Sequence, residues 1–170
     1  HYRCRMIAMG TNTDPYQPIE REHRITRAIL RVLADFNHPV SIVTKSALVL
    51  RDVDILAPMA EKGLAQVCVS VTTLDRALAR RMEPRAATPE RRLATIAALA
   101  AAGIPTGVMV APVIPALTDH EMESILAAAG QAGAGSAGYT VLRLPLEIKD
   151  LFIEWLNTHA PLKANHVMAM

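Results

Sequence analysis

The most constraining feature of this sequence is a fivefold alternation between short apolar runs and longer segments with helical periodicity. The apolar runs are rich in Val, Ile and Met, and they mostly lack polar residues at alternate positions. Such runs are typical of strands that are buried on both faces of a parallel sheet. We predict strands at residues 5–9, 40–44, 66–71, 106–111 and 137–143. Parallel neighbours need a crossover of about a dozen residues, and the intervening segments supply it.

The first two intervening segments are predicted to be helical. Residues 19–38 carry an apolar stripe at helical spacing, which we expect to face the core. The stripe consists of Ile25, Ile29, Val32, Leu33 and Phe36, and arginines lie outside it at positions 21, 24, 27 and 31. Residues 50–62 contain Pro58, which should kink or interrupt the second helix.

The later segments carry clearer helix-end signals. A short helix is expected at residues 74–81, and the next helix should begin with Thr88 as N-cap and Pro89 at its first position, and end at Gly103. Thr118 and Glu121 are spaced as a capping box. Residues 146–159 and 161–170 are expected to form the last helices. The side chains expected to point inward are Leu93, Ile96, Ala97 and Ala100, and later Ile148, Leu151, Phe152 and Trp155.

Five β/α units in a row fit either a doubly wound open sheet or part of a β/α barrel. No glycine-rich fingerprint follows a predicted strand and opens a helix, and the chain has no GxxxxGK[ST] pattern. We therefore predict an α/β protein with a partial, TIM-like β/α barrel, formed by residues 1–170 as a single domain. Five strands are too few to close a barrel, so a further strand is expected before His1.

Composition and charge exclude several other classes of protein. The net charge is +2 and aromatic residues make up only 4% of the chain, which does not favour a nucleic-acid stacking surface. Cys4 and Cys68 form no metal-ligand spacing. No apolar run approaches the roughly 20 residues that span a bilayer. We predict a cytoplasmic protein that does not enter the membrane.

Polar residues follow the first two predicted strands. Thr13 and Asp14 could bind an ammonium group, although such residues before a proline also close turns. Lys45 could neutralise a carboxylate or phosphate, act as a Schiff-base amine, or lie at the surface.

The later strand ends are also polar or stiff. Ser70 and Thr72 lie on the same side of their strand, where both could reach a ligand hydroxyl. Ala111 precedes a proline-rich wall, and Arg143 could either enter the mouth of the barrel or pair with Glu147.

Five motifs then appear in a characteristic order. They are Thr11-Asn12-Thr13-Asp14, Val43-Thr44-Lys45, Val69-Ser70-Val71-Thr72, Met82-Glu83-Pro84 with Thr88-Pro89-Glu90-Arg91-Arg92, and Gly107-Val108-Met109-Val110-Ala111-Pro112. Together they resemble the radical S-adenosylmethionine (radical SAM) superfamily, in the branch that contains spore photoproduct lyase. The resemblance covers residues 5–115, and its specificity comes from the order of the motifs.

This resemblance implies a six-unit barrel that holds a [4Fe-4S] cluster and SAM, with a flavodoxin- or ferredoxin-type electron donor. The cofactor would yield a 5′-deoxyadenosyl radical that abstracts hydrogen from an unknown substrate. Thr13 and Asp14 would contact the methionyl amino group, Lys45 the carboxylate, Ser70 the ribose and Ala111 the adenine. Glu83 and Arg91 match the motif as supporting residues.

Two departures limit what the resemblance implies. The cluster-binding CxxxCxxC motif is absent, and in the family it follows the first barrel strand, upstream of the motifs seen here. The lyase also carries a hydrogen-donating cysteine where this chain has Thr11, which argues against DNA photoproduct repair by that route. Without its cluster segment, this chain alone is expected to be inactive.

Two other hypotheses remain open at this point. One is a β/α-barrel enzyme that forms a Schiff base through Lys45. The other is a nucleic-acid-binding module that uses the four arginines of the first helix, and its affinity should fall steeply with salt.

Overall fold

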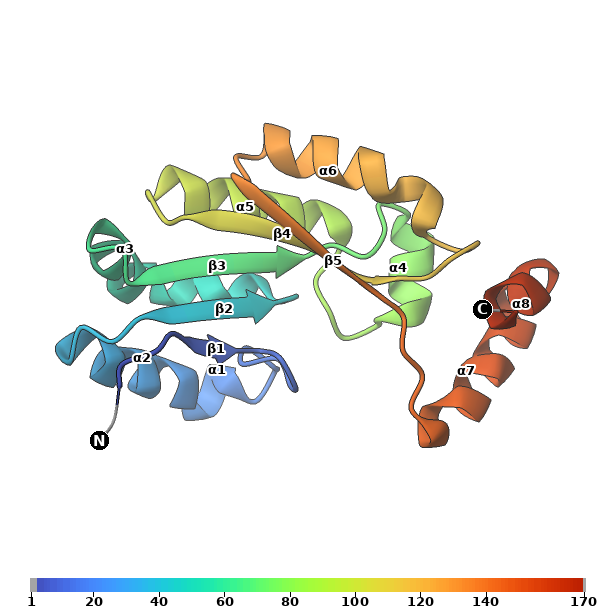
Figure 1. Ribbon diagram of the computed structural model, residues 1–170, viewed down its shortest axis with the longest axis horizontal. Coiled ribbons are helices and arrows are strands. Elements are labelled where there is room, and N and C mark those ends of the chain that lie inside the picture. Colours follow the sequence, from blue (N-terminus) through green and yellow to red (C-terminus); the bar gives the residue numbers. More distant parts are fainter. Residues whose placement is uncertain (1–2, 170) are drawn as a thin grey trace.

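The computed structural model describes residues 3–169 as one parallel sheet with helices, followed by a C-terminal helical pair (Figure 1). The five strands are hydrogen-bonded in sequence order, and every pair is parallel. They are β1 (Ile7–Met9), β2 (Val40–Thr44), β3 (Ala65–Ser70), β4 (Thr106–Val113) and β5 (Ser136–Val141). Because β1 and β5 do not pair within the described residues, the sheet is open. The predicted α/β class and partial β/α barrel are confirmed.

Helices connect the strands and cover one face of the sheet. After β1 come α1 (Glu20–His23) and α2 (Ile25–Asp35), and after β2 come a 3-10 turn (Ala47–Asp52) and α3 (Val53–Glu61). After β3 come α4 (Arg76–Met82) and α5 (Pro89–Ala101), and β4 leads through a 3-10 turn (Asp119–Glu121) to α6 (Met122–Gln131). The chain ends in α7 (Leu146–His159) and α8 (Pro161–Met168). No helix in residues 3–169 is long and apolar enough to cross a membrane.

Alternation along the strands separates a helix-covered face from a face that is free to bind ligands. The covered face carries Val40, Ile42, Val67, Val69, Val108 and Val110, which pack with Leu30, Leu56, Ile96, Leu99 and Ile125 of the helices. At the positions between them, Val43, Ser70 and Met109 line a cavity instead. The same alternation therefore builds both the core and one wall of the candidate site.

The predicted core face of α2 is wrong except at Leu33, which is buried as expected. Thr26, Leu30 and Leu33 are the buried residues of α2, whereas Ile25, Ile29, Val32 and Phe36 are exposed, Phe36 by 80%. At about 100° per residue, the exposed stripe lies roughly a quarter turn from the buried face, on the flank opposite Arg27, which contacts α3. Hydrophobic periodicity located an apolar stripe, but the sheet determined which flank of the helix is covered.

One substitution on the buried face of α2 and one on its exposed apolar stripe should differ in their effect on the free energy of unfolding. Leu30→Ala should lower the free energy of unfolding by about 2–5 kcal/mol, because it opens a cavity in the core. Phe36→Ala should change it by less than about 0.5 kcal/mol. Urea denaturation of both variants would contradict this description if Phe36→Ala were the more destabilising change.

Three further helix expectations were wrong in detail. Helix α3 continues through Pro58. The preceding 3-10 turn ends at Asp52, after which the α-helix begins. Thr118 does not cap the helix that follows, because its hydroxyl accepts the Ile114 N–H at 3.0 Å. Glu121 is not part of a capping box either, because its carboxylate accepts from Thr73 and Leu74.

The inward faces predicted for α5 and α7 are correct only in part. Within α5, Ile96 is buried but Ala97 is exposed, because the buried positions are Pro89, Arg92, Thr95, Ile96 and Leu99. Within α7, Phe152 and Trp155 pack at a second core, whereas Ile148 and Leu151 are exposed. That second core joins α7 and α8 to α4 through Leu78, Leu156, Ala164 and Val167.

A glycine-rich segment between α6 and β5 matches the spacing GxGxxG at Gly133, Gly135 and Gly138. In a dinucleotide-binding fingerprint, this spacing follows a strand and opens a helix. Here the order is reversed, because helix α6 precedes it and strand β5 begins within it. The match therefore does not indicate a dinucleotide site.

Candidate functional site

The C-terminal ends of the strands surround one main cavity of about 1050 Å³. Of the five residues predicted to bind cofactor, Asp14, Lys45, Ser70 and Ala111 line this cavity. They come from four successive strand ends, which meet because parallel strands end at the same edge of a sheet. Thr13 is exposed and is not among the lining residues, whereas its neighbour Asn12 is.

Asp14 is the most firmly held of these residues. Its Oδ1 accepts the Tyr16 N–H at 2.8 Å and the Thr44 hydroxyl at 2.7 Å, and its Oδ2 accepts the Lys45 N–H at 2.8 Å. A carboxylate has about four acceptor positions, so one position on Oδ2 is left for a ligand. The arrangement is a fixed anion with one free acceptor at the edge of the cavity.

The tight approach of the Asp14 loop to β2 requires Gly10. Its φ is +94°, a conformation that L side chains rarely adopt, and an added Cβ would lie 2.0 Å from the Val43 carbonyl oxygen. Any other residue would push the loop away from β2. Gly10 thus allows Asp14 to reach the N–H groups and hydroxyl that fix it.

Lys45 is joined to a partly buried ion-pair chain. Its Nζ forms an ion pair with Oε1 of Glu83, and Oε2 of Glu83 accepts from Arg92 Nη2 at 2.6 Å. Arg92 is only 2% exposed and also donates to the carbonyls of Ser70 and Ala87. Burial alone would raise the pKa of Glu83, but the positive charges of Arg92 and Lys45 outweigh it and hold the pKa below its usual range.

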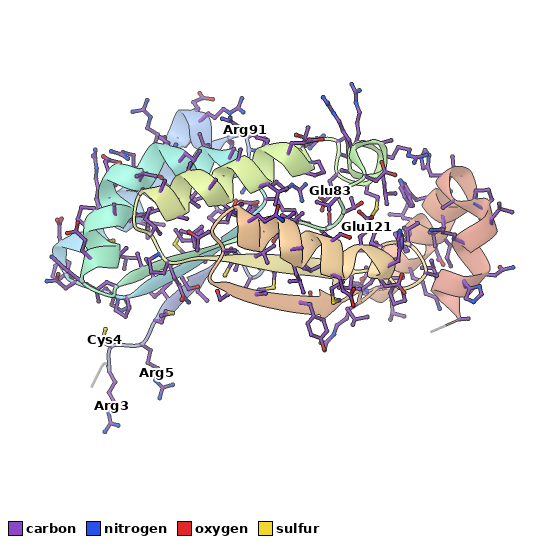
Figure 2. All side chains as sticks on the ribbon, turned by 90° about the horizontal axis from the view of Figure 1, so that it is seen from above. Arg3, Cys4, Arg5, Glu83, Arg91 and Glu121 are labelled. Atoms are coloured by element: carbon purple, nitrogen blue, oxygen red, sulfur yellow. The ribbon has the colours of Figure 1, made fainter. Side chains whose placement is uncertain are left out.

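The ion-pair chain carries two cations and one anion, so one positive charge remains at the Lys45 end. Arg92, not the predicted Arg91, is the arginine of this chain. Arg91 is exposed at the surface, away from Glu83 (Figure 2). The signal that could have identified Arg92 is its spacing of four and seven residues from Ile96 and Leu99, which places all three on the buried face of α5.

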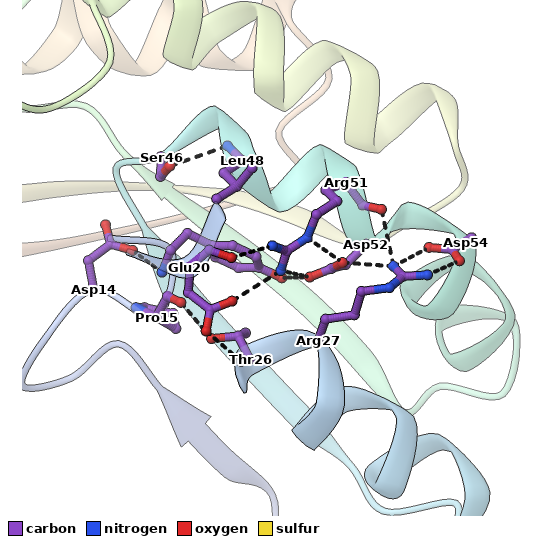
Figure 3. Close-up of polar contacts among 11 residues, drawn as sticks. Asp14, Pro15, Glu20, Thr26, Arg27, Ser46, Leu48, Arg51, Asp52 and Asp54 are labelled. Atoms are coloured by element: carbon purple, nitrogen blue, oxygen red, sulfur yellow. Dashed lines mark hydrogen bonds and ion pairs between the residues drawn. The ribbon is translucent and has the colours of Figure 1, made fainter. Parts of the chain in front are cut away.

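A second polar network lies beside the Asp14 loop and supports it (Figure 3). Asp52 is fully buried and accepts hydrogen bonds from Arg27, Arg51 and the Tyr16 hydroxyl. Burial would raise the pKa of Asp52, but the hydrogen bonds from Arg51 and Arg27 keep it below its ordinary value. Because Tyr16 also gives its N–H to Asp14, the network anchors the loop that carries the carboxylate.

The remaining contacts of this network fix the start of α2. The Thr26 hydroxyl donates to the Pro15 carbonyl at 2.5 Å, and the Thr26 N–H donates to Glu20 at 2.8 Å. Arg27 also pairs with Asp54 at 2.6 Å. Arg27 is therefore committed to the fold, and the four arginines do not form a continuous free stripe for nucleic acid.

Comparison with known families shows to which family this chain belongs. The sequence model of the radical SAM superfamily matches residues 1–129. The chain belongs to the radical SAM superfamily. The match runs from β1 into α6 and so includes the four strand ends that line the main cavity.

Proteins similar to this chain occur in distant organisms. The chain is 41% identical over 160 residues to uncharacterized protein Rv2578c of Mycobacterium tuberculosis, which covers 91% of this chain and 46% of the relative. It is 33% identical over 115 residues to uncharacterized protein MJ0683 of Methanocaldococcus jannaschii, covering 68% and 43%. Uncharacterized protein ORF301 of Acidianus two-tailed virus is 32% identical over 114 residues, covering 67% and 36%. The chain spans less than half the length of each.

The residues of the main cavity fit SAM but not an iron–sulfur cluster. The side chains lining the cavity provide an acceptor at Asp14, a cation at Lys45 and a hydroxyl at Ser70, which match the ammonium, carboxylate and ribose of SAM. Within residues 3–169, no group of three or more Cys, His, Asp or Glu side chains could hold a metal ion. Cys4 lies in the exposed segment before β1 (Figure 2), and burial raises the pKa of the Cys68 thiol.

Arg143 is also part of the cavity wall, which decides between the two placements expected for it. No hydrogen bond or ion pair joins its side chain to Glu147 or to another residue of the described chain. The cavity thus extends from the Asp14 loop to the end of β5, where Tyr139 and Arg143 line it. The cavity therefore extends beyond the four residues predicted to contact the cofactor.

Proposed function

We propose that the main cavity binds SAM and that the complete protein is a radical SAM enzyme. The observation that carries this proposal is the convergence of Asp14, Lys45, Ser70 and Ala111 on one cavity. The free position on Asp14 Oδ2 would accept from the methionyl ammonium group, and Lys45 would bind the methionyl carboxylate. The Ser70 hydroxyl would contact the ribose, and the backbone at Ala111 would contact the adenine.

SAM, bound together with the iron–sulfur cluster of the superfamily, would supply a radical that abstracts hydrogen from a substrate. Because residues 3–169 offer no ligand set for the cluster, its ligands belong to another part of the complete protein in this proposal. An electron donor of flavodoxin or ferredoxin type and an unidentified substrate would be its partners. The role of the chain described here is to orient the amino-acid end and the ribose of SAM.

A Schiff-base mechanism through Lys45 is less well supported. Schiff-base lysines are activated by an apolar pocket or by a neighbouring cation. Lys45 instead faces a carboxylate, Glu83, in an ion pair. That environment suits a lysine that binds an anion as a fixed positive charge.

Calorimetric titration with SAM and with decarboxylated SAM tests the role of Lys45 directly. The unmodified chain should bind SAM about ten- to a hundredfold more tightly, the effect of one charge-assisted hydrogen bond. Lys45→Met should abolish this preference while leaving the affinity for decarboxylated SAM unchanged. Lys62→Met removes the same charge at an exposed site and should retain the preference. Equal binding of both ligands by the unmodified chain would refute the assignment of Lys45, and absence of SAM binding would refute the proposed function.

A further inference from the structure

A second, smaller cleft of about 240 Å³ lies beside the main cavity and shares Asp14 and Lys45 with it. We call it the arginine cleft. The residues that line it are Asp14, Tyr16, Gln17, Pro18, Arg21, Lys45, Ser46, Arg85, Ala86 and Ala87. They come from the Asp14 loop, the start of α1, the end of β2 and the connection between α4 and α5. Three segments that are distant in sequence therefore close around one small volume.

The charges around the arginine cleft are unbalanced. Arg21 and Arg85 both line it, and neither side chain forms an ion pair or hydrogen bond within residues 3–169. The nearby Lys45 is held by Glu83, which Arg92 shares. The one carboxylate of the cleft, Asp14, already accepts three hydrogen bonds, which spread its negative charge. Two guanidinium groups without a carboxylate partner give the cleft an excess of positive charge, which a bound anion would balance.

The hydrogen-bonding groups point to the same kind of ligand. Each guanidinium carries about five N–H donors and no acceptor. The oxygen of Ser46 already accepts the Leu48 N–H at 3.2 Å, which leaves its hydroxyl proton free to donate. The side-chain amide of Gln17 adds further donors. A wall with many donors and a single carboxylate fits an oxyanion, and the planar fork of arginine matches phosphate oxygens in particular.

We propose that the arginine cleft binds a phosphate group, with Arg21 and Arg85 as its principal ligands. Because Asp14 and Lys45 separate the cleft from the main cavity, a phosphate held there lies next to the ligand of that cavity. The phosphate then belongs to a phosphorylated substrate whose other end reaches the main cavity. Only this last step, which assigns the phosphate to a substrate, rests on the proposed function.

Titration with two phosphate probes, followed by nuclear magnetic resonance at constant ionic strength, tests the cleft. Inorganic phosphate represents the free ion, and dimethyl phosphate represents a phosphodiester. Saturable binding is expected with a dissociation constant of about 1 mM or lower. Arg21→Gln and Arg85→Gln should each weaken it about tenfold or more, the effect of losing one charge-assisted pair. Tighter binding of inorganic phosphate would assign the cleft to a free ion or monoester, and tighter binding of dimethyl phosphate to a diester.

Two other exposed arginines supply matched controls. Arg31→Gln and Arg91→Gln remove the same charge outside the cleft, and they should leave the affinity within about twofold. Equal weakening by all four variants would show general charge attraction and overturn the proposal, as would the absence of saturable binding.

Addition of SAM separates this proposal from the proposed function. Phosphate that still binds in the presence of saturating SAM supports two adjacent sites. Phosphate displaced by SAM would place the anion at the carboxylate position of Lys45 and would overturn the arginine cleft. If SAM does not bind but the arginine variants behave as expected, the cleft stands and the proposed function fails.

Discussion

Glu83→Ala is expected to lower the free energy of unfolding by about 3–5 kcal/mol, the cost of leaving a buried charge without its partner. Arg92 is 2% exposed, and Glu83 is its one carboxylate partner among the described residues. Removing Glu83 also frees Lys45 at the edge of the main cavity. Urea denaturation at neutral pH measures the loss.

Two comparisons sharpen this prediction. Glu154→Ala, at an exposed position of α7, should change stability by less than about 0.5 kcal/mol. The double variant Glu83→Ala with Arg92→Met should be more stable than Glu83→Ala alone, because it removes the orphaned charge as well. A Glu83→Ala variant as stable as the unmodified protein would show that the ion-pair chain does not hold the fold together.

Asp52→Asn is expected to destabilise the protein by about 3–5 kcal/mol at pH 7 and by clearly less at pH 3. The carboxylate is fully buried between Arg27 and Arg51, and its pKa in the folded protein lies below the usual value. A lowered folded pKa means that the unfolded chain binds the proton first as pH falls. The stabilisation is therefore complete above about pH 4, near the pKa of an unfolded Asp. It is lost as pH falls from there through the folded pKa.

Thermal or urea unfolding at several pH values between 7 and 3 tests whether stability falls on acidification as expected. The unmodified protein should lose stability on acidification, and Glu83, whose pKa is also lowered, should add to the loss. Asp52→Asn should show a shallower pH dependence over the same range. Parallel curves for both proteins would contradict the role assigned to Asp52.

The sequence alone predicted the strands closely. Strand β2 and helix α7 lie at the predicted residues, and the other strand boundaries differ by one or two positions. This follows because the central strands β2, β3 and β4 are largely buried, and buried parallel strands read as nearly continuous apolar runs. The order of the strand ends was then enough to place Asp14, Lys45, Ser70 and Ala111 together.

The flank of each helix that faces the core could not be predicted in the same way. The apolar stripe of α2 is a strong pattern, yet Leu33 is its one buried member, whereas Leu30, which lies outside the predicted stripe, is buried and Phe36 is exposed. The hydrophobic pattern of a single helix indicates only that the helix has an apolar surface. The position of the sheet determines which surface is covered.

The candidate site shows what the sequence and the tertiary structure each contributed. From the sequence alone, the fivefold strand–helix alternation predicted a partial β/α barrel. The motif order pointed to Thr13, Asp14, Lys45, Ser70 and Ala111 as one site, and Thr13 is the one that does not line the cavity. Only the tertiary structure decided that Asp14 retains one free acceptor, that Glu83 and Arg92 hold Lys45, and that Arg21 and Arg85 share a cleft. Strand order depends on local pattern, whereas charge balance depends on pairs of side chains from segments that meet only after folding.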